Sequence, residues 1–103
     1  MIKEINQENF NEEISSGFHV VDVYGTYCGP CKLLAAVLEQ VDKKYPFLSI
    51  LKLNSDNNKE LAAELKIKAV PTILLYEDGE LIKRQTGALN EKDFMALVAD
   101  YLY

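Results

Sequence analysis

At 103 residues the chain is about the size of one domain, and we expect residues 1–103 to form a single domain with one core. Sixteen acidic residues against eleven basic ones give a net charge of −5, which argues against binding to a nucleic-acid backbone. No apolar stretch is long enough to span a membrane, and charges interrupt the start of the chain where a secretory signal would be apolar, so we expect a cytoplasmic monomer with no membrane partner.

The first elements alternate between strand and helix. Residues 2–5 have the pattern of an edge strand, and residues 9–15 carry apolar side chains four apart, which indicates a short helix. Asn6 is placed to cap that helix. Residues 19–24 are nearly continuous in β-branched and apolar side chains, as expected for a central strand that is covered on both faces.

The longest helical pattern covers residues 29–45, and Pro46 stops it. After it, the same criteria predict strands over 48–53, 72–76 and 81–86, and helices over 58–65 and 90–101. Asp78 and Gly79 supply the turn of a hairpin between the last two strands, and Asn90 is placed to begin the last helix.

Alternating strands and helices imply right-handed crossovers and a parallel core, while the hairpin adds antiparallel strands at one side. We therefore predict an α/β fold with a central mixed sheet of about five strands sandwiched between about four helices. In such sheets, reactive residues lie beyond the carboxyl ends of the parallel strands. Cys28 is at that position.

The motif Cys28-Gly29-Pro30-Cys31 follows a buried strand and opens a helix, the setting in which such a cysteine pair is redox-active. A thiolate at a helix N-terminus accepts free backbone N–H groups, and a proline in the first turn costs no hydrogen bond. Cys28 is thus the expected attacking thiol and Cys31 the shielded, resolving thiol. The alternatives are a pair of inert thiols or a zinc site, for which His19 is the only further ligand of its kind.

Asp22 interrupts the apolar run of residues 19–24, and a carboxylate is costly to bury without a use or a compensating partner. Burial would raise its pKa and suit it to take the proton from Cys31, directly or through water. The alternative is a solvated Asp22 on an exposed strand face. Lys52, on the neighbouring predicted strand, is the candidate charge partner of Asp22, or else an outward surface lysine.

Residues 21–32 resemble the active-site segment of the thioredoxin family, and residues 70–72 resemble its cis-proline loop. The resemblance extends over essentially the whole chain. It implies the thioredoxin fold and a protein-disulfide reductase that needs no cofactor or metal. It also implies that Cys28 and Cys31 cycle between dithiol and disulfide, that a thioredoxin reductase returns the electrons, and that the clients are disulfide-containing proteins, either many or one dedicated client.

The resemblance assigns further roles. It makes Cys28 the nucleophile, Cys31 the resolving cysteine, Asp22 the buried acid–base group and Lys52 its partner. It also makes Pro71 cis and places it against the cysteines, although a cis bond before proline is uncommon. The residues expected to form a flat, largely apolar docking surface for an extended client strand are Tyr27, Gly29, Pro30, Ala69, Val70, Pro71, Gly87 and Ala88.

The chain departs from the usual family pattern at three positions. Tyr24 and Tyr27 stand where relatives usually have tryptophan, and Ala36 where they often have a helix-kinking proline. The tyrosines keep aromatic bulk but add a hydroxyl, which alters the surroundings of the cysteines. Two other functions are open. One is a binding module that uses the fold to clamp a partner without redox turnover, and the other is an oxidase or isomerase, which also uses two cysteines in this spacing but normally needs an oxidising compartment.

Overall fold

The computed structural model describes residues 1–102. Within them the chain forms five strands and four α-helices, in agreement with the predicted fold. The strands are β1 (Ile2–Ile5), β2 (Phe18–Tyr24), β3 (Ile50–Asn54), β4 (Thr72–Glu77) and β5 (Glu80–Thr86). The helices are α1 (Phe10–Glu13), α2 (Gly29–Lys44), α3 (Lys59–Glu64) and α4 (Glu91–Val98), and a 3₁₀ turn (Ala99–Tyr101) follows α4.

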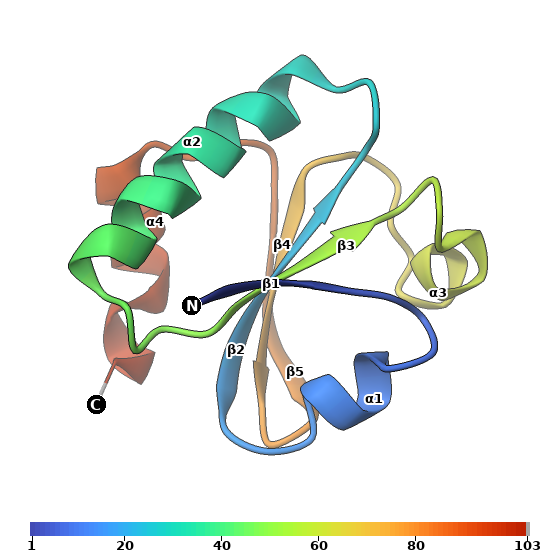
Figure 1. Cartoon of the computed structure of the whole chain (residues 1–103), viewed down its shortest axis with the longest axis horizontal. Coiled ribbons are helices and arrows are strands. Elements are labelled where there is room, and N and C mark those ends of the chain that lie inside the picture. The colour runs from blue at the N-terminus through green and yellow to red at the C-terminus, as the bar shows by residue number, and fades with distance from the viewer. Residues whose placement is uncertain (103) are drawn as a thin grey trace.

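The strands form one mixed sheet in the order β1-β3-β2-β4-β5 (Figure 1). Strands β1, β3 and β2 are parallel, whereas β4 is antiparallel to both of its neighbours, β2 and β5. The predicted parallel core with an antiparallel hairpin at one side is therefore confirmed. Strand β2 lies in the middle of the sheet, and its carboxyl end leads into the loop before α2.

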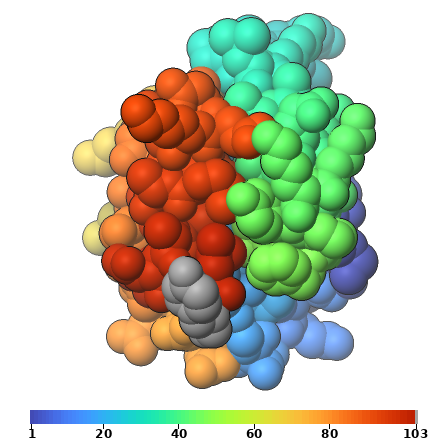
Figure 2. Space-filling view, turned by 90° about the vertical axis from the view of Figure 1, so that its left-hand side faces the viewer, coloured from blue at the N-terminus to red at the C-terminus, as the bar shows by residue number. Residues whose placement is uncertain are grey.

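Helices α2 and α4 cover one face of the sheet, and α1 and α3 cover the other (Figure 1). Figure 2 looks onto α2 and α4, which lie side by side. Because successive strand residues point to opposite faces, the sheet separates two apolar cores. The core under α2 and α4 contains Val20, Leu34, Leu38, Val41, Leu48, Ile50, Ile73, Leu75, Phe94 and Val98. The core under α1 and α3 contains Ile5, Phe10, Ile14, Val21, Val23, Leu51, Leu53, Leu61, Leu74 and Tyr76.

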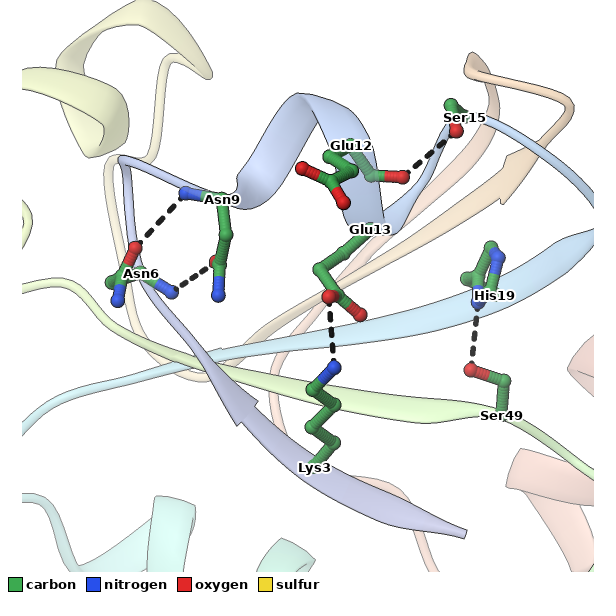
Figure 3. Close-up of polar contacts among 8 residues, drawn as sticks. All are labelled: Lys3, Asn6, Asn9, Glu12, Glu13, Ser15, His19 and Ser49. Carbon is green, nitrogen blue, oxygen red and sulfur yellow. Dashed lines mark hydrogen bonds and ion pairs between the residues drawn. The ribbon is translucent and has the colours of Figure 1, made fainter.

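The predicted cap of the first helix was wrong. Helix α1 is only four residues long, and its N-cap position is Asn9 rather than Asn6. The Asn6 side chain instead accepts hydrogen bonds from the backbone N–H groups of Glu8 and Asn9, at 2.9 and 3.0 Å. Figure 3 shows Asn6 and Asn9 bonded to one another in the turn before α1. Asn6 therefore stabilises the turn that leads into the helix, because an asparagine bonds as readily in such a turn as at an N-cap.

The later elements agree with their predicted positions to within two residues. The helix predicted over residues 29–45 ends at Lys44, ahead of Pro46. The strand predicted from Leu48 begins later, because the N–H of Leu48 donates to the carbonyl of Tyr45 and holds this segment in a turn. Asn90 caps α4, as predicted, by accepting the N–H of Asp93 at 2.8 Å. Within residues 1–102, each helix is too short or too polar to cross a membrane.

Candidate active site

Cys28 and Cys31 form a disulfide at the start of α2, with their Cα atoms 5.2 Å apart. Cys28 is the N-cap residue in an extended conformation, and its sulfur accepts the backbone N–H of Cys31 at 3.2 Å. Cys28 is half-buried, whereas Cys31 is only 4 % exposed. Pro30 lies in the first turn of α2, where its missing N–H breaks no helical bond. The two cysteines therefore differ in exposure, and Cys28 is the more accessible residue.

The loop before β4 lies against the disulfide. The carbonyl oxygen of Val70 is 3.8 Å from the sulfur of Cys28, and the peptide bond between Val70 and Pro71 is cis, as the family resemblance implied. Gly25 faces this loop, and a Cβ there would lie 3.2 Å from Cγ2 of Val70, which is a tight contact. The carbonyl of Pro71 accepts the N–H of Gly87 at 2.8 Å, which joins the loop to the end of β5. The structure thus brings three distant segments together beside the disulfide.

The residues predicted to form the docking surface differ in exposure. Tyr27 is 98 % exposed, ahead of the cysteines. Pro71 is buried, so its own side chain is not accessible at this surface. The other residues of this set are exposed (Gly29, Pro30, Ala69, Ala88) or half-buried (Val70, Gly87).

Asp22 is 0 % exposed, so the alternative of a solvated carboxylate is wrong. It follows Val20 by two positions on β2 and therefore faces α2. Neither of its carboxyl oxygens has a hydrogen-bond partner among the described residues. Burial raises the pKa of Asp22 to about 6, while the positive charge of Lys52 lowers it and the negative charge of Glu4 raises it. Asp22 is thus a buried carboxyl group that gains and loses its proton near neutral pH.

Lys52 lies opposite Asp22 in the pairing of β2 with β3. Its ammonium group does not form an ion pair with Asp22 among residues 1–102, and instead lies 4.8 Å from the ring centre of Tyr24. Lys52 is half-buried, so it is not a freely exposed surface lysine. Its influence on Asp22 is electrostatic.

A hollow of about 200 Å³ separates the start of α2 from the sheet. The residues lining it are Tyr24, Gly25, Thr26, Cys31, Lys32, Ala35 and Lys52. This volume is several times the share that one water molecule occupies in the liquid, which is about 30 Å³. Water therefore has room to reach both the shielded cysteine and the lysine that lies opposite Asp22.

Two acidic residues without a role predicted from the sequence also contact the site. The carboxylate of Asp56 accepts the N–H of Thr26 at 2.8 Å, which lowers its pKa and fixes the loop before the cysteines. The carboxylate of Glu4 accepts the hydroxyl of Tyr24 at 2.9 Å. Burial and, next, this hydrogen bond raise the pKa of Tyr24 to about 12. Nothing in the sequence identifies these contacts, because both join residues that are at least 20 positions apart.

The zinc alternative has no ligand set in the structure. Among residues 1–102, no three histidine, cysteine, aspartate or glutamate side chains lie close enough together to hold a metal ion. His19 lies at the opposite end of β2 from the cysteines, where its ring bonds to the hydroxyl of Ser49 at 2.7 Å (Figure 3). The other ring nitrogen of His19 bonds to the carbonyl of Ser16 at 2.8 Å. Its position is that of a structural residue at the start of a strand.

Comparison with known proteins agrees with these features. The family model described as thioredoxin matches residues 1–100. The chain is 32 % identical to a thioredoxin of Chlamydia trachomatis, over 98 % of this chain and 99 % of that protein. It is 37 % identical to a thioredoxin of Chlamydia pneumoniae over 92 % of each chain, and 38 % identical to one of Staphylococcus haemolyticus over 96 % of this chain and 95 % of that protein. With its mixed five-stranded sheet and a cysteine pair at the start of α2, the chain belongs to the thioredoxin family.

Proposed function

We propose that this protein-disulfide reductase of the thioredoxin family uses Cys28 as its nucleophile and Cys31 as its resolving cysteine. The observation that carries the assignment is the difference between the two cysteines. Cys28 caps the N-terminus of a 16-residue helix and is partly accessible, and its sulfur accepts a backbone N–H. Cys31 is buried.

In the first step, the thiolate of Cys28 attacks one sulfur of a client disulfide. The client S–S bond breaks, a bond forms between Cys28 and the attacked sulfur, and the second client sulfur leaves as a thiolate that takes up a proton. The helix dipole favours the attacking thiolate by about 0.3–1 kcal/mol, which lowers its pKa by less than about one unit. The hydrogen bond from the N–H of Cys31 supplies further stabilisation.

In the second step, Cys31 must lose its proton before it can attack the mixed disulfide. We assign this proton to Asp22, directly or through water in the hollow beside Cys31. With a pKa raised to about 6 by burial, Asp22 is mostly ionised at neutral pH and still basic enough to accept the proton. The Cys31 thiolate then attacks the sulfur of Cys28, the Cys28–Cys31 disulfide forms, and the client leaves with both of its sulfurs reduced.

Each turnover moves two electrons from the protein to the client, so another protein must return them. We propose a thioredoxin reductase as this donor and disulfide-containing proteins as the clients, with the chain acting as a monomer in the cytoplasm, where thiols are kept reduced. An extended client segment would pair with the backbone beside Pro71, next to the Cys28 sulfur, on the proposed docking surface. Lys52 is the proposed charge partner of Asp22.

Two variants test the assignment. Cys28→Ser is expected to abolish reduction of a model protein disulfide, measured with a reductase and its electron donor. Cys31→Ser is expected to stop after the first step, so that the variant accumulates clients bound covalently through Cys28, which mass spectrometry detects after alkylation. Turnover that survives in Cys28→Ser would contradict the role of the nucleophile. Normal function without trapped clients in Cys31→Ser would favour a clamp over a reductase.

A further inference from the structure

Glu4 lies in one row with the two charged residues beneath α2. Glu4 on β1 pairs with Lys52 on β3, and Lys52 pairs with Asp22 on β2. Paired residues on neighbouring parallel strands point to the same face of the sheet, so the three side chains share the face that α2 covers (Figure 1). Lys52 thus lies between two carboxylates, one exposed and one buried.

Tyr24 connects the exposed carboxylate to the lysine. Its hydroxyl donates a hydrogen bond to Oε2 of Glu4 at 2.9 Å, and the ammonium group of Lys52 lies 4.8 Å from the centre of its ring. An ammonium group over an aromatic ring is attracted by the negative face of the ring. Neither Glu4 nor Asp22 forms an ion pair with Lys52 among the described residues. The tyrosine ring therefore holds the lysine charge, and Glu4 fixes the ring.

We propose that Glu4 is a positioning residue of the disulfide site, which holds Lys52 over the Tyr24 ring and away from Asp22 through its hydrogen bond to Tyr24 and its own charge. The inference rests on the acid–base role proposed above for Asp22. A lysine that closed onto Asp22 would stabilise the carboxylate and make it a weaker base for the proton of Cys31. Glu4 therefore keeps Asp22 able to accept that proton near neutral pH.

The groups that surround Asp22 support this account. Burial raises the pKa of Asp22, the charge of Lys52 opposes that rise, and the charge of Glu4 adds to it. On β4, the residue opposite Asp22 is Ile73, which does not titrate. Among the described residues, the charged and titratable groups in the strand row beside Asp22 and in the hollow at the start of α2 are Glu4 of β1, Tyr24 of β2, Lys52 of β3, and Cys31 and Lys32 of α2.

The test measures the pKa of Asp22 from the NMR shift of its carboxyl carbon in the reduced protein. Glu4→Gln removes the charge but keeps an oxygen for the Tyr24 hydroxyl, and Glu4 is exposed, so the core is undisturbed. Two strand spacings, about 10 Å, separate Glu4 from Asp22, and we expect the pKa to fall by roughly half a pH unit. The control Glu12→Gln removes the same charge from α1, on the opposite face, and should leave it unchanged (Figure 3). An unchanged pKa in folded Glu4→Gln would overturn the proposal.

A second comparison tests whether Glu4 acts through Lys52. In a Lys52→Gln background, Glu4→Gln is expected to lower the pKa of Asp22 by clearly less than it does in the parent protein. An equal fall in both backgrounds would show direct repulsion alone and would also overturn the positioning role.

The rate of client release from the mixed disulfide gives a separate readout. Its acid limb is expected to move to lower pH by the same amount as the pKa of Asp22. If the pKa of Asp22 fell but the pH profile of client release did not change, Asp22 would not be the base in the proposed function. The fall in pKa would still support the positioning of Lys52 by Glu4.

Discussion

Replacing Asp22 with asparagine is expected to change the pH dependence of stability. Asp22 is fully buried, and neither of its carboxyl oxygens has a hydrogen-bond partner among the described residues. Burial raises its pKa from the ordinary 3.8 to about 6 in the folded protein. The folded state then binds this proton more tightly than the unfolded chain does. The stabilisation of the folded state by protonated Asp22 is fully present below about pH 4 and is lost as the pH rises through about 6.

The size of this loss follows from the difference between the two pKa values. About two pH units at about 1.4 kcal/mol each give roughly 3 kcal/mol. Asparagine does not ionise, so its own burial cost is the same at every pH. We therefore expect the free energy of unfolding of Asp22→Asn, relative to that of the parent protein, to increase by roughly 3 kcal/mol between pH 4 and pH 8.

Urea unfolding with the disulfide intact, followed by circular dichroism at several pH values from 4 to 8, measures this quantity. The control is Asp100→Asn, because Asp100 is an exposed carboxylate close to the C-terminus. That substitution should give a difference that varies little with pH. If Asp22→Asn and the parent protein differed by the same amount at pH 4 and pH 8, burial of a costly carboxylate would be refuted.

Three further substitutions test other contacts. Leu34 is a fully buried residue of α2, so Leu34→Ala should lower the free energy of unfolding, measured in urea, by about 2–5 kcal/mol; a loss below about 1 kcal/mol would contradict the packing. Gly25→Ala places a Cβ 3.2 Å from Cγ2 of Val70 and should slow reduction of a model disulfide several-fold, and an unchanged rate would show that the loop yields freely. Asp56→Ala removes the acceptor of the Thr26 N–H and should speed hydrogen exchange at that amide by about tenfold or more, whereas equal exchange would mean that the loop is held elsewhere.

Local sequence patterns were sufficient to predict the helices and strands and the position of the two cysteines at the start of a helix. The run over residues 19–24 predicts a central strand, because a short, nearly continuous stretch of β-branched and apolar residues is typical of a strand covered on both faces. The motif at Cys28 and Cys31 is local too, since a helix N-terminus determines both its geometry and its chemistry. The prediction for Asn6 failed for a related reason: asparagine forms the same kind of bond in a turn and at a helix cap, and the sequence does not distinguish the two.

The rest of the site depends on register and on side-chain direction, which local patterns do not contain. Lys52 could be placed on a neighbouring strand, but its position over the Tyr24 ring follows from the tertiary structure. The sequence pattern places Glu4 in an edge strand. Its position two strands away from Asp22 follows only from the register of the sheet. The cis bond before Pro71 came from family resemblance rather than from the residues themselves.

The two outer strands of the sheet also have a consequence for self-association. An unpaired strand edge offers a row of free N–H and carbonyl groups to any other extended chain. Here β1 has only four residues, while β5 carries Lys83 and Arg84 and is offset from β4 by an irregularity between Leu75 and Tyr76. Short length, charge and a bulge each discourage edge-to-edge stacking. These three features therefore work against polymerisation of the chain on copies of itself.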